Sequence, residues 1–187
     1  MRIITGKYKG RHFDIPRTFK ARPTTDFAKE NIFNVLTGYM DLEGTAALDL
    51  FSGTGSITLE LLSRGCGQVV SIEMDRDHHR FICDCLKKLL PEQNCPAVLP
   101  LRADAFRFIR QCHQQFDFIF ADPPYALKEL PTIPGLIFEK GLLKPDGILV
   151  FEHGKEHDFS GDSHFVEHRS YGSVNFSIFR TTEKASE

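Results

Sequence analysis

The chain has 187 residues, a formal net charge of −2 and 41% hydrophobic residues. Its length is typical of one main domain, and its apolar content is sufficient for a real core. No apolar run approaches the roughly 18 residues that a membrane-spanning helix needs. The N-terminus has neither the apolar stretch nor the cleavage site of a secretory signal. We therefore expect no membrane segment and no secretion signal.

The five cysteines are odd in number, and no Cys-x-x-Cys pair occurs. Cys83 and Cys85 are too close together to form a zinc site by themselves, so we expect reduced thiols in a cytoplasmic protein. His153 and His157 are spaced like half of a helical metal site, but Gly154 argues against a helix and no third ligand is evident. We predict no metal.

The charge is distributed unevenly along the chain. Residues 1–22 hold seven cations and one anion, whereas the rest of the chain has a net charge of −8. A basic arm on an acidic body indicates a polyanionic partner that the arm contacts, although a solvated basic hairpin accounts for the charge equally well. Ile3-Ile4 and Phe13-Asp14-Ile15 flank a turn-rich middle, which predicts a small β-hairpin.

A helix is expected to follow the arm. In Arg22-Pro23-Thr24-Thr25-Asp26 a threonine can cap the helix, and Asp26 falls in the first turn, where the helix dipole favours an anion. Gly38 is a plausible end. The apolar side of this helix is predicted to comprise Phe27, Ile32, Phe33, Val35 and Leu36.

From residue 46 onward, short apolar strands alternate with amphipathic helices, which predicts a mostly parallel α/β sheet. The expected strands are Ala46–Phe51, Gln68–Ile72, Ala97–Leu101, Phe116–Ala121 and Gly147–Phe151, and helices are expected near 56–64, 76–90, 104–113 and 127–140. Two further strands, at 164–170 and 173–180, form a C-terminal antiparallel hairpin. We divide the chain into a basic arm (1–22), one domain (23–182) and a frayed tail (183–187).

A cofactor site is predicted where the first strand runs into Ser52-Gly53-Thr54-Gly55 and a helix. This strand, glycine turn and helix arrangement is typical of a nucleotide-binding crevice, because glycines let the backbone turn sharply beside a ligand. A dinucleotide fingerprint would have a third glycine at position 58. Thr58 stands there instead, which weakens the case for NAD.

Acidic residues follow the neighbouring strands. Glu73 can accept hydrogen bonds from both hydroxyls of a ribose, with Asp75 and Asp77 as alternatives, and Asp104 can contact the exocyclic amine of an adenine. Each lies at the carboxyl end of a strand, as does Asp49, so the set predicts a nucleoside-containing cofactor. The full predicted cofactor site is Asp49, Phe51, Gly53, Gly55, Glu73, Met74, Asp104, Ala105 and Asp122.

The catalytic site is predicted at Asp122-Pro123-Pro124-Tyr125, after the buried strand Phe116–Ala121. Two prolines stop the strand and stiffen the turn. The Asp122 carboxylate and the Pro123 carbonyl would accept the hydrogens of an exocyclic base amine and stabilise the positive charge that develops on its nitrogen. Tyr125 offers a ring on which an extruded base can stack, and this needs the ring rather than the hydroxyl.

These residues resemble the RsmD family of bacterial 16S rRNA guanine-N2 methyltransferases over nearly the full length. The resemblance rests on Met1–Ile4, Tyr8–Arg11, Arg22–Asp26, Asp49–Gly55, Leu59-Glu60, Ser63–Gly65 and Asp122–Tyr125. It implies a class I methyltransferase fold with a seven-stranded sheet, S-adenosylmethionine as methyl donor, and assembled or assembling small-subunit RNA as substrate. Arg22, Pro23 and Thr24 match a segment that closes over the cofactor and the substrate. Thr58 and Leu61 depart from the family pattern.

The predicted function is therefore methylation of a guanine N2 amine in 16S rRNA. The predicted RNA contacts are Lys7, Lys9, Arg11, Arg22, Pro23 and Thr24. Adenine-N6 methylation of DNA or RNA is the nearest alternative, because the tetrapeptide is common to both chemistries. Methylation of a protein amide or small amine, and a non-catalytic RNA-binding module, remain as weaker alternatives.

Overall fold

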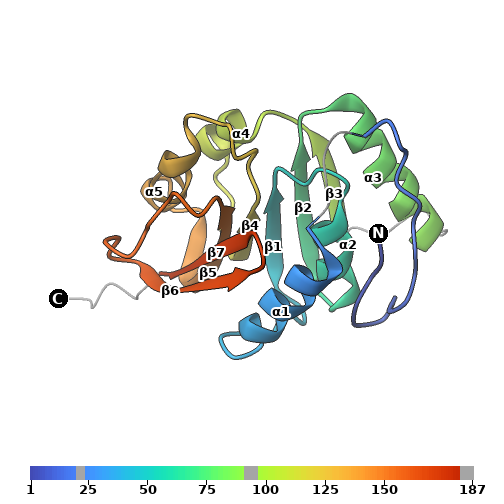
Figure 1. Ribbon diagram of the computed structural model, residues 1–187. Coiled ribbons are helices and arrows are strands. Elements are labelled where there is room, and N and C mark those ends of the chain that lie inside the picture. Colours follow the sequence, from blue (N-terminus) through green and yellow to red (C-terminus); the bar gives the residue numbers. More distant parts are fainter. Residues whose placement is uncertain (20–23, 91–96, 182–187) are drawn as a thin grey trace.

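The computed structural model describes residues 1–19, 24–90 and 97–181, and its centre is one seven-stranded sheet (Figure 1). The strand order is β3-β2-β1-β4-β5-β7-β6, with parallel pairing from β3 to β5 and antiparallel pairing of β7 with β5 and β6. The strands are β1 (Ala46–Leu50), β2 (Gln68–Glu73), β3 (Val98–Arg102), β4 (Phe116–Ala121), β5 (Leu143–His153), β6 (Phe165–Tyr171) and β7 (Val174–Arg180). This confirms the predicted class I methyltransferase fold with its antiparallel hairpin.

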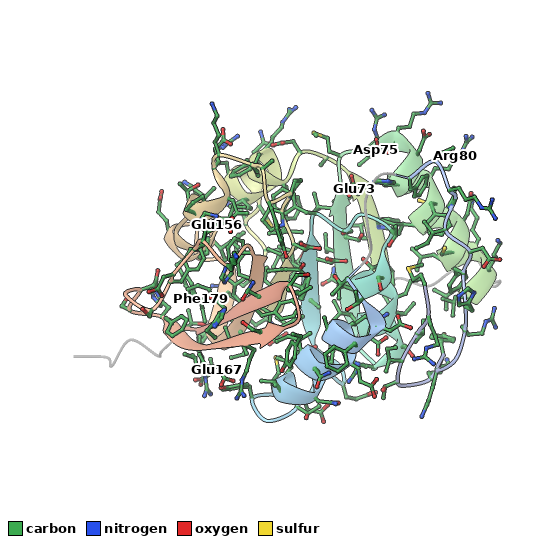
Figure 2. All side chains as sticks on the ribbon, viewed as in Figure 1. Glu73, Asp75, Arg80, Glu156, Glu167 and Phe179 are labelled. Atoms are coloured by element: carbon green, nitrogen blue, oxygen red, sulfur yellow. The ribbon has the colours of Figure 1, made fainter. Side chains whose placement is uncertain are left out.

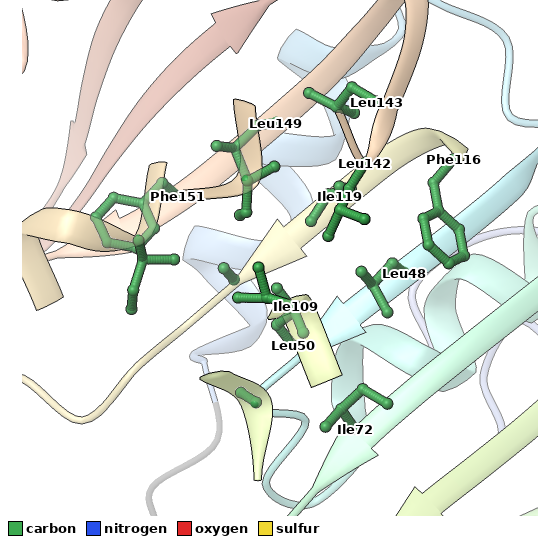
Figure 3. Packing of buried hydrophobic residues seen from close by; sticks show 14 of the residues in the cluster. Leu48, Leu50, Ile72, Ile109, Phe116, Ile119, Leu142, Leu143, Leu149 and Phe151 are labelled. Atoms are coloured by element: carbon green, nitrogen blue, oxygen red, sulfur yellow. The ribbon is translucent and has the colours of Figure 1, made fainter. Parts of the chain in front are cut away.

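Helices cover both faces of the sheet. They are α1 (Asp26–Leu36), α2 (Ser56–Ser63), α3 (Arg76–Leu89), α4 (Ala105–Gln111) and α5 (Ile133–Glu139), with the short 3-10 helix η1 (Leu130–Thr132) before α5. In the hairpin, Phe179 of β7 is buried near Phe138 of α5, with ring centroids 6.1 Å apart (Figure 2). Figure 3 shows part of the buried core, where Ile109 of α4 packs with Leu48 and Ile119 of the sheet. On the opposite face, α1 and α2 pack against the sheet through Ile32 and Leu61.

The helix starts follow from side chains that cap them. Thr25 accepts a hydrogen bond from the backbone of Ala28, so α1 begins where predicted. Asp75 caps α3 and Asp104 caps α4 in the same way, each by accepting backbone N–H groups that have no partner inside the helix. Because these caps lie directly after β2 and β3, they bring carboxylates to the carboxyl ends of the strands.

Two details of the expected helices are wrong, and β5 begins at Leu143 rather than at Gly147. Phe27 is 64% exposed and lies edge-on to Tyr171, so it is not part of the buried side of α1. The helix expected near 127–140 begins only at Leu130 and divides into η1 and α5. Pro131 and Pro134 stand in the first turns of these two helices, where a proline fits because the missing N–H needs no partner.

The N-terminal arm has fewer strand-pairing contacts than a β-hairpin would have. A single antiparallel bridge joins Arg2 to His12, with the Ile3 N–H bonded to the Arg11 carbonyl at 3.0 Å. The two predicted strands are therefore absent from the described part of the arm. Ile3 and Phe13 are buried against α2 and α3 instead, so the arm folds as a layer on these helices (Figure 1).

Buried ionic side chains connect the arm to the body. The carboxylate of Glu60 on α2 accepts the N–H groups of Ile4 and Thr5 at 2.8 and 3.1 Å, and it pairs with Arg64 at 2.9 Å. Lys29 of α1 is fully buried and donates to the Arg2 carbonyl at 2.6 Å. Burial lowers the pKa of Lys29.

The predicted boundaries at residues 22 and 182, and the tail after them, lie outside the described residues and remain predictions. None of the helices in the described part of the chain is long and apolar enough to span a membrane.

Candidate active site

A cavity of about 980 Å³ opens at the carboxyl ends of the parallel strands. Open α/β sheets bind their ligands at this edge, where the direction of the chain crossovers changes between two neighbouring strands. Here β1 lies between β2 and β4, so the edge is shared by residues that are distant in sequence. The predicted site residues that line the cavity are Thr24, Asp49, Phe51, Gly53, Glu73, Met74, Asp104, Ala105, Asp122, Pro123 and Tyr125.

The glycine turn has two different tasks. Gly53 lines the cavity at a φ of 53°, and its N–H donates to Oε2 of Glu73 at 2.7 Å. Gly55 is not among the lining residues. A Cβ at Gly55 would lie 2.8 Å from Cγ1 of Ile82, and its φ of 77° disfavours other residues. The structure therefore gives Gly55 a packing role between α2 and α3, while Gly53 faces the cavity.

The predicted ribose and adenine contacts lie together at one end of the cavity. Glu73 also accepts the N–H of Asp75 through Oε1 at 2.7 Å (Figure 2), and an ionised carboxylate still has lone pairs for ribose hydroxyls. Met74 is 65% exposed beside it. Asp104 uses Oδ1 to cap α4 at the Arg107 N–H, 2.8 Å away. These residues form a polar edge with an apolar side chain next to it.

Asp49 is the centre of a buried hydrogen-bond network. Its side chain is 1% exposed and accepts a 2.5 Å hydrogen bond from the Thr58 hydroxyl. Thr58 also contacts Ser71 at 3.0 Å, and Ser71 contacts Ser52 at 2.8 Å. Burial raises the pKa of Asp49 to about 7. The threonine that departs from the family pattern thus holds this carboxylate in place, a role that its position in the sequence did not reveal.

The predicted catalytic tetrapeptide Asp122-Pro123-Pro124-Tyr125 contacts a residue that sequence reasoning missed, Glu152. Its carboxylate is 5% exposed at the end of β5 and lines the same cavity. The Tyr125 hydroxyl donates to Oε1 of Glu152 at 2.9 Å, and the Thr24 hydroxyl lies 3.4 Å from Oε2. The signal was present, because Glu152 follows the apolar strand run that ends at Phe151, as Asp122 follows its own strand.

Three carboxyl groups, Asp49, Asp122 and Glu152, therefore share one cavity. Asp122 faces the cavity, and burial together with the charges of Glu152 and Asp49 raises its pKa well above the ordinary value. Burial also raises the pKa of Glu152 to about 7. The pKa of Tyr125 is raised by burial and by Glu152, so its hydroxyl keeps its proton and donates. The site favours ligands that bring hydrogen-bond donors or positive charge.

The predicted RNA contacts fall into three groups. Lys7, Lys9 and Arg11 are exposed on the arm, away from the cavity lining. The Lys7 N–H is anchored to the Ser63 carbonyl at 2.7 Å, and Arg11 donates to the Lys88 carbonyl at 3.2 Å. Thr24 lines the cavity. Arg22 and Pro23 lie outside the described residues.

The histidines considered as metal ligands have other partners. Nδ1 of His153 lies 2.8 Å from the Gly154 carbonyl, and Nε2 lies 2.8 Å from the Ser177 hydroxyl. Within the described ranges, no three His, Cys, Asp or Glu side chains are grouped so that they could hold a metal ion.

Comparison with known proteins places the chain in a family. The family model described as Conserved hypothetical protein 95 matches residues 1–180. Ribosomal RNA small subunit methyltransferase D of Haemophilus influenzae is 31% identical over 83% of this chain and 80% of its own. The solved structure of yhhF from Escherichia coli has a TM-score of 0.83 at 26% identity, covering 97% of this chain and 98% of that chain.

A more distant structure has the same fold. It is a 16S rRNA N2 guanine methyltransferase from T. thermophilus in complex with AdoMet and guanosine, with a TM-score of 0.67 at 16% identity, covering 87% of this chain and 45% of that one. The family model covers nearly all of the chain, and the related enzyme is similar over most of its length. The chain therefore belongs to the Conserved hypothetical protein 95 family, the RsmD family that its sequence motifs indicate.

Proposed function

We propose that this protein transfers a methyl group from S-adenosylmethionine to the exocyclic N2 amine of a guanine in 16S rRNA of the small ribosomal subunit. One observation carries the proposal: Asp122 and Pro123 open into the same cavity as Asp49, Gly53 and Glu73. An amine-binding turn and a nucleoside-binding edge thus lie within one cavity. The small-subunit RNA as substrate is supported by the related H. influenzae enzyme, which is named for it.

The residues of the cavity fit S-adenosylmethionine. Glu73 and Asp104 supply acceptors for ribose hydroxyls and an adenine amine, while Met74, Phe51 and Ala105 supply apolar surface. The volume of about 980 Å³ is at the upper end of small-molecule pockets, which leaves space for a base beside the cofactor. When bound, this cofactor supplies an electrophilic methyl group on a positively charged sulfur, and the three carboxyl groups of the cavity suit that charge.

The catalytic turn, formed by Asp122-Pro123-Pro124-Tyr125, acts on the exocyclic amine of the base. The lone pair of an exocyclic base amine is delocalised into the ring, so the nitrogen is a poor nucleophile. The Asp122 carboxylate and the Pro123 carbonyl accept its hydrogens, which favours a pyramidal nitrogen with its lone pair directed at the methyl group. The negative charge of Asp122 also stabilises the positive charge that develops on the nitrogen.

A proton must leave the methylated nitrogen. Formation of the nitrogen–methyl bond would break the sulfur–methyl bond, leave the sulfur as a neutral thioether and move the positive charge to the nitrogen. The nitrogen is then strongly acidic, so it needs only an acceptor within reach. Burial and the neighbouring carboxylates raise the pKa of Asp122, which makes it a better proton acceptor than an exposed aspartate. Asp122 then releases the proton to solvent after the product leaves.

Two further features suit the binding of an RNA substrate. Tyr125, the last residue of the catalytic tetrapeptide, is 43% exposed, so its ring is available for stacking with an extruded base. The exposed cations of the arm, Lys7, Lys9 and Arg11, suit contacts with phosphates. A ribosomal RNA substrate in turn supports the cytoplasm as the location of the enzyme.

The test is a methylation assay with isotope-labelled S-adenosylmethionine on three substrates: naked 16S RNA, small subunits and DNA. Labelled nucleosides are then identified after digestion. We expect N2-methylguanosine from RNA and no label in DNA, and Asp122→Ala as a control should give no label at all. N6-methyladenosine as the product would replace this proposal with the adenine alternative, and label in neither base would end both.

A further inference from the structure

We propose that Glu152 is the specificity-determining residue of this site and accepts the N1–H of the target guanine. The inference rests on the proposed function and deepens it. The catalytic turn binds an exocyclic amine but does not distinguish guanine from adenine, since both bases have one. The neighbouring ring nitrogen does distinguish them, because N1 carries a hydrogen in guanine and a lone pair in adenine.

The position of Glu152 suits this task. In the sheet, Ala121 of β4 is paired with Phe151 of β5, so Asp122 and Glu152 are the next residues of two adjacent parallel strands. Neighbouring strands are about 4.8 Å apart. The N2 amine and N1–H of guanine are neighbours on one edge of the base. An edge whose amine meets Asp122 therefore presents its N1–H toward Glu152.

The chemistry of Glu152 also suits it. An ionised carboxylate only accepts hydrogen bonds and has about four lone-pair positions. The Tyr125 and Thr24 hydroxyls occupy two of these, which fixes the carboxylate and leaves capacity for a ligand. Glu152 lines the cavity, so this capacity faces the place of the base. A lone pair from adenine N1 would meet the ionised carboxylate with repulsion.

The electrostatics of the cavity point to the same ligand edge. Burial raises the pKa values of Asp49 and Glu152, and their charges add to burial in raising that of Asp122, because like charges in a buried site are costly. A guanine edge brings an N1–H and two N2 hydrogens to these groups at once. It therefore stabilises the ionised carboxylates that the site otherwise disfavours, and an adenine edge brings one donor group fewer.

The test uses RNA substrates with either guanine or 2-aminopurine at the methylated position. 2-Aminopurine keeps the exocyclic 2-amine but has a lone pair at N1. The wild-type enzyme should prefer guanine by about tenfold to a hundredfold in kcat/KM, as expected for a hydrogen bond to a charged group. In Glu152→Gln, the amide can donate to N1 of 2-aminopurine, so this preference should fall to within a few-fold.

The matched control is Glu156→Gln, which removes a neighbouring carboxylate that is exposed and should leave the preference unchanged. If Glu152→Gln slows both substrates equally, Glu152 only holds Tyr125 and Thr24, and the proposal is overturned. If the wild-type enzyme methylates neither base at N2, the proposed function fails, and this result is separate from the first.

A second measurement needs no variant. RNA with inosine at the target keeps the N1–H but has no amine to methylate, so it should inhibit the wild-type enzyme. RNA with 1-methylinosine at that position lacks the N1–H and should inhibit at least about tenfold more weakly. Equal inhibition by the two RNAs would show that N1 is not contacted and would overturn the proposal even if Glu152→Gln does not fold.

Discussion

The Tyr125 hydroxyl donates a 2.9 Å hydrogen bond to the carboxylate of Glu152, which joins the Asp122–Tyr125 turn after β4 to the end of β5. Tyr125 is 43% exposed, whereas Glu152 is 5% exposed. The aromatic ring is thus held by its polar end while a large part of its surface stays accessible. The hydroxyl therefore has a structural role in addition to the stacking that we propose for the ring.

This relationship makes Tyr125→Phe informative. We expect a loss of kcat/KM of about tenfold, since a hydrogen bond to the buried Glu152 is removed at a cost of about 1–3 kcal/mol. Tyr125→Ala should lose about tenfold to a hundredfold more, because base–aromatic stacking contributes about 1–3 kcal/mol. Single-turnover rates on small subunits measure both. Full activity of Tyr125→Phe would show that the hydroxyl does not contribute to activity. Equal losses in both variants would show that the ring does not contribute by stacking.

Asp122→Ala should abolish turnover, with a rate at least about a hundredfold to a thousandfold lower, because the charge on the reacting nitrogen is no longer stabilised. Cofactor affinity should change by no more than a few-fold, since the predicted ribose and adenine contacts are at Glu73 and Asp104. Stability should not fall, because the pKa of Asp122 is raised by burial and its removal relieves that cost. Rate and calorimetric binding measured on the same preparation check this, and retained turnover would refute the role of Asp122.

The basic arm gives a prediction about salt. Lys7→Gln with Lys9→Gln should weaken RNA binding and lower the slope of log Kd against log salt by up to about 2, which corresponds to two phosphate contacts. The matched control is Lys87→Gln with Lys140→Gln, because both lysines are exposed and their ammonium groups pair with carboxylates close by in sequence, Asp84 at 3.8 Å and Glu139 at 3.6 Å. Filter binding across salt concentrations measures the slopes. The same slope in both double variants would place the RNA surface elsewhere.

Thr58→Val tests the network around Asp49. The substitution keeps the shape but removes the Thr58 hydroxyl as a donor to the buried carboxyl, so the free energy of unfolding should fall by about 1–3 kcal/mol. Thr132→Val removes an exposed hydroxyl that donates to the Glu129 carbonyl at 2.7 Å, and it should change stability by less than about 0.5 kcal/mol. Chemical denaturation compares them. Equal losses of stability in the two variants would mean that the network around Asp49 contributes no more to stability than an exposed hydrogen bond.

The pKa of Glu152 predicts a pH dependence of stability. Folding raises this pKa from 4.5 to about 7, so the folded state binds the proton more tightly and this contribution to stability is lost as pH rises through that interval. Glu152→Gln has no such proton. The Tm of the variant minus that of the wild type should therefore increase between about pH 4.5 and about pH 7.5. A difference that stays constant over this range would contradict the burial of an ionisable carboxyl here.

Much of this architecture could be predicted from local patterns. Apolar strands ending in Asp49, Glu73 and Asp122 indicate both the sheet and the residues at its edge, because parallel strands bring their carboxyl ends together. The contact between Glu152 and Tyr125 could not be predicted in this way. It joins side chains 27 positions apart through a pairing register that no local pattern specifies. The burial of the arm likewise depends on α2, which lies far along the chain.

The carboxylate of Glu60, which accepts the N–H groups of Ile4 and Thr5, has a consequence for the thermodynamics of RNA association. Ordering a free basic segment on RNA would cost conformational entropy for every residue fixed. Here that cost is already met during folding, so the cations of the arm are preorganised. A substitution of Glu60 that removes its hydrogen bonds to Ile4 and Thr5 would free the arm. RNA binding should then become more favourable in enthalpy, less favourable in entropy and weaker in total.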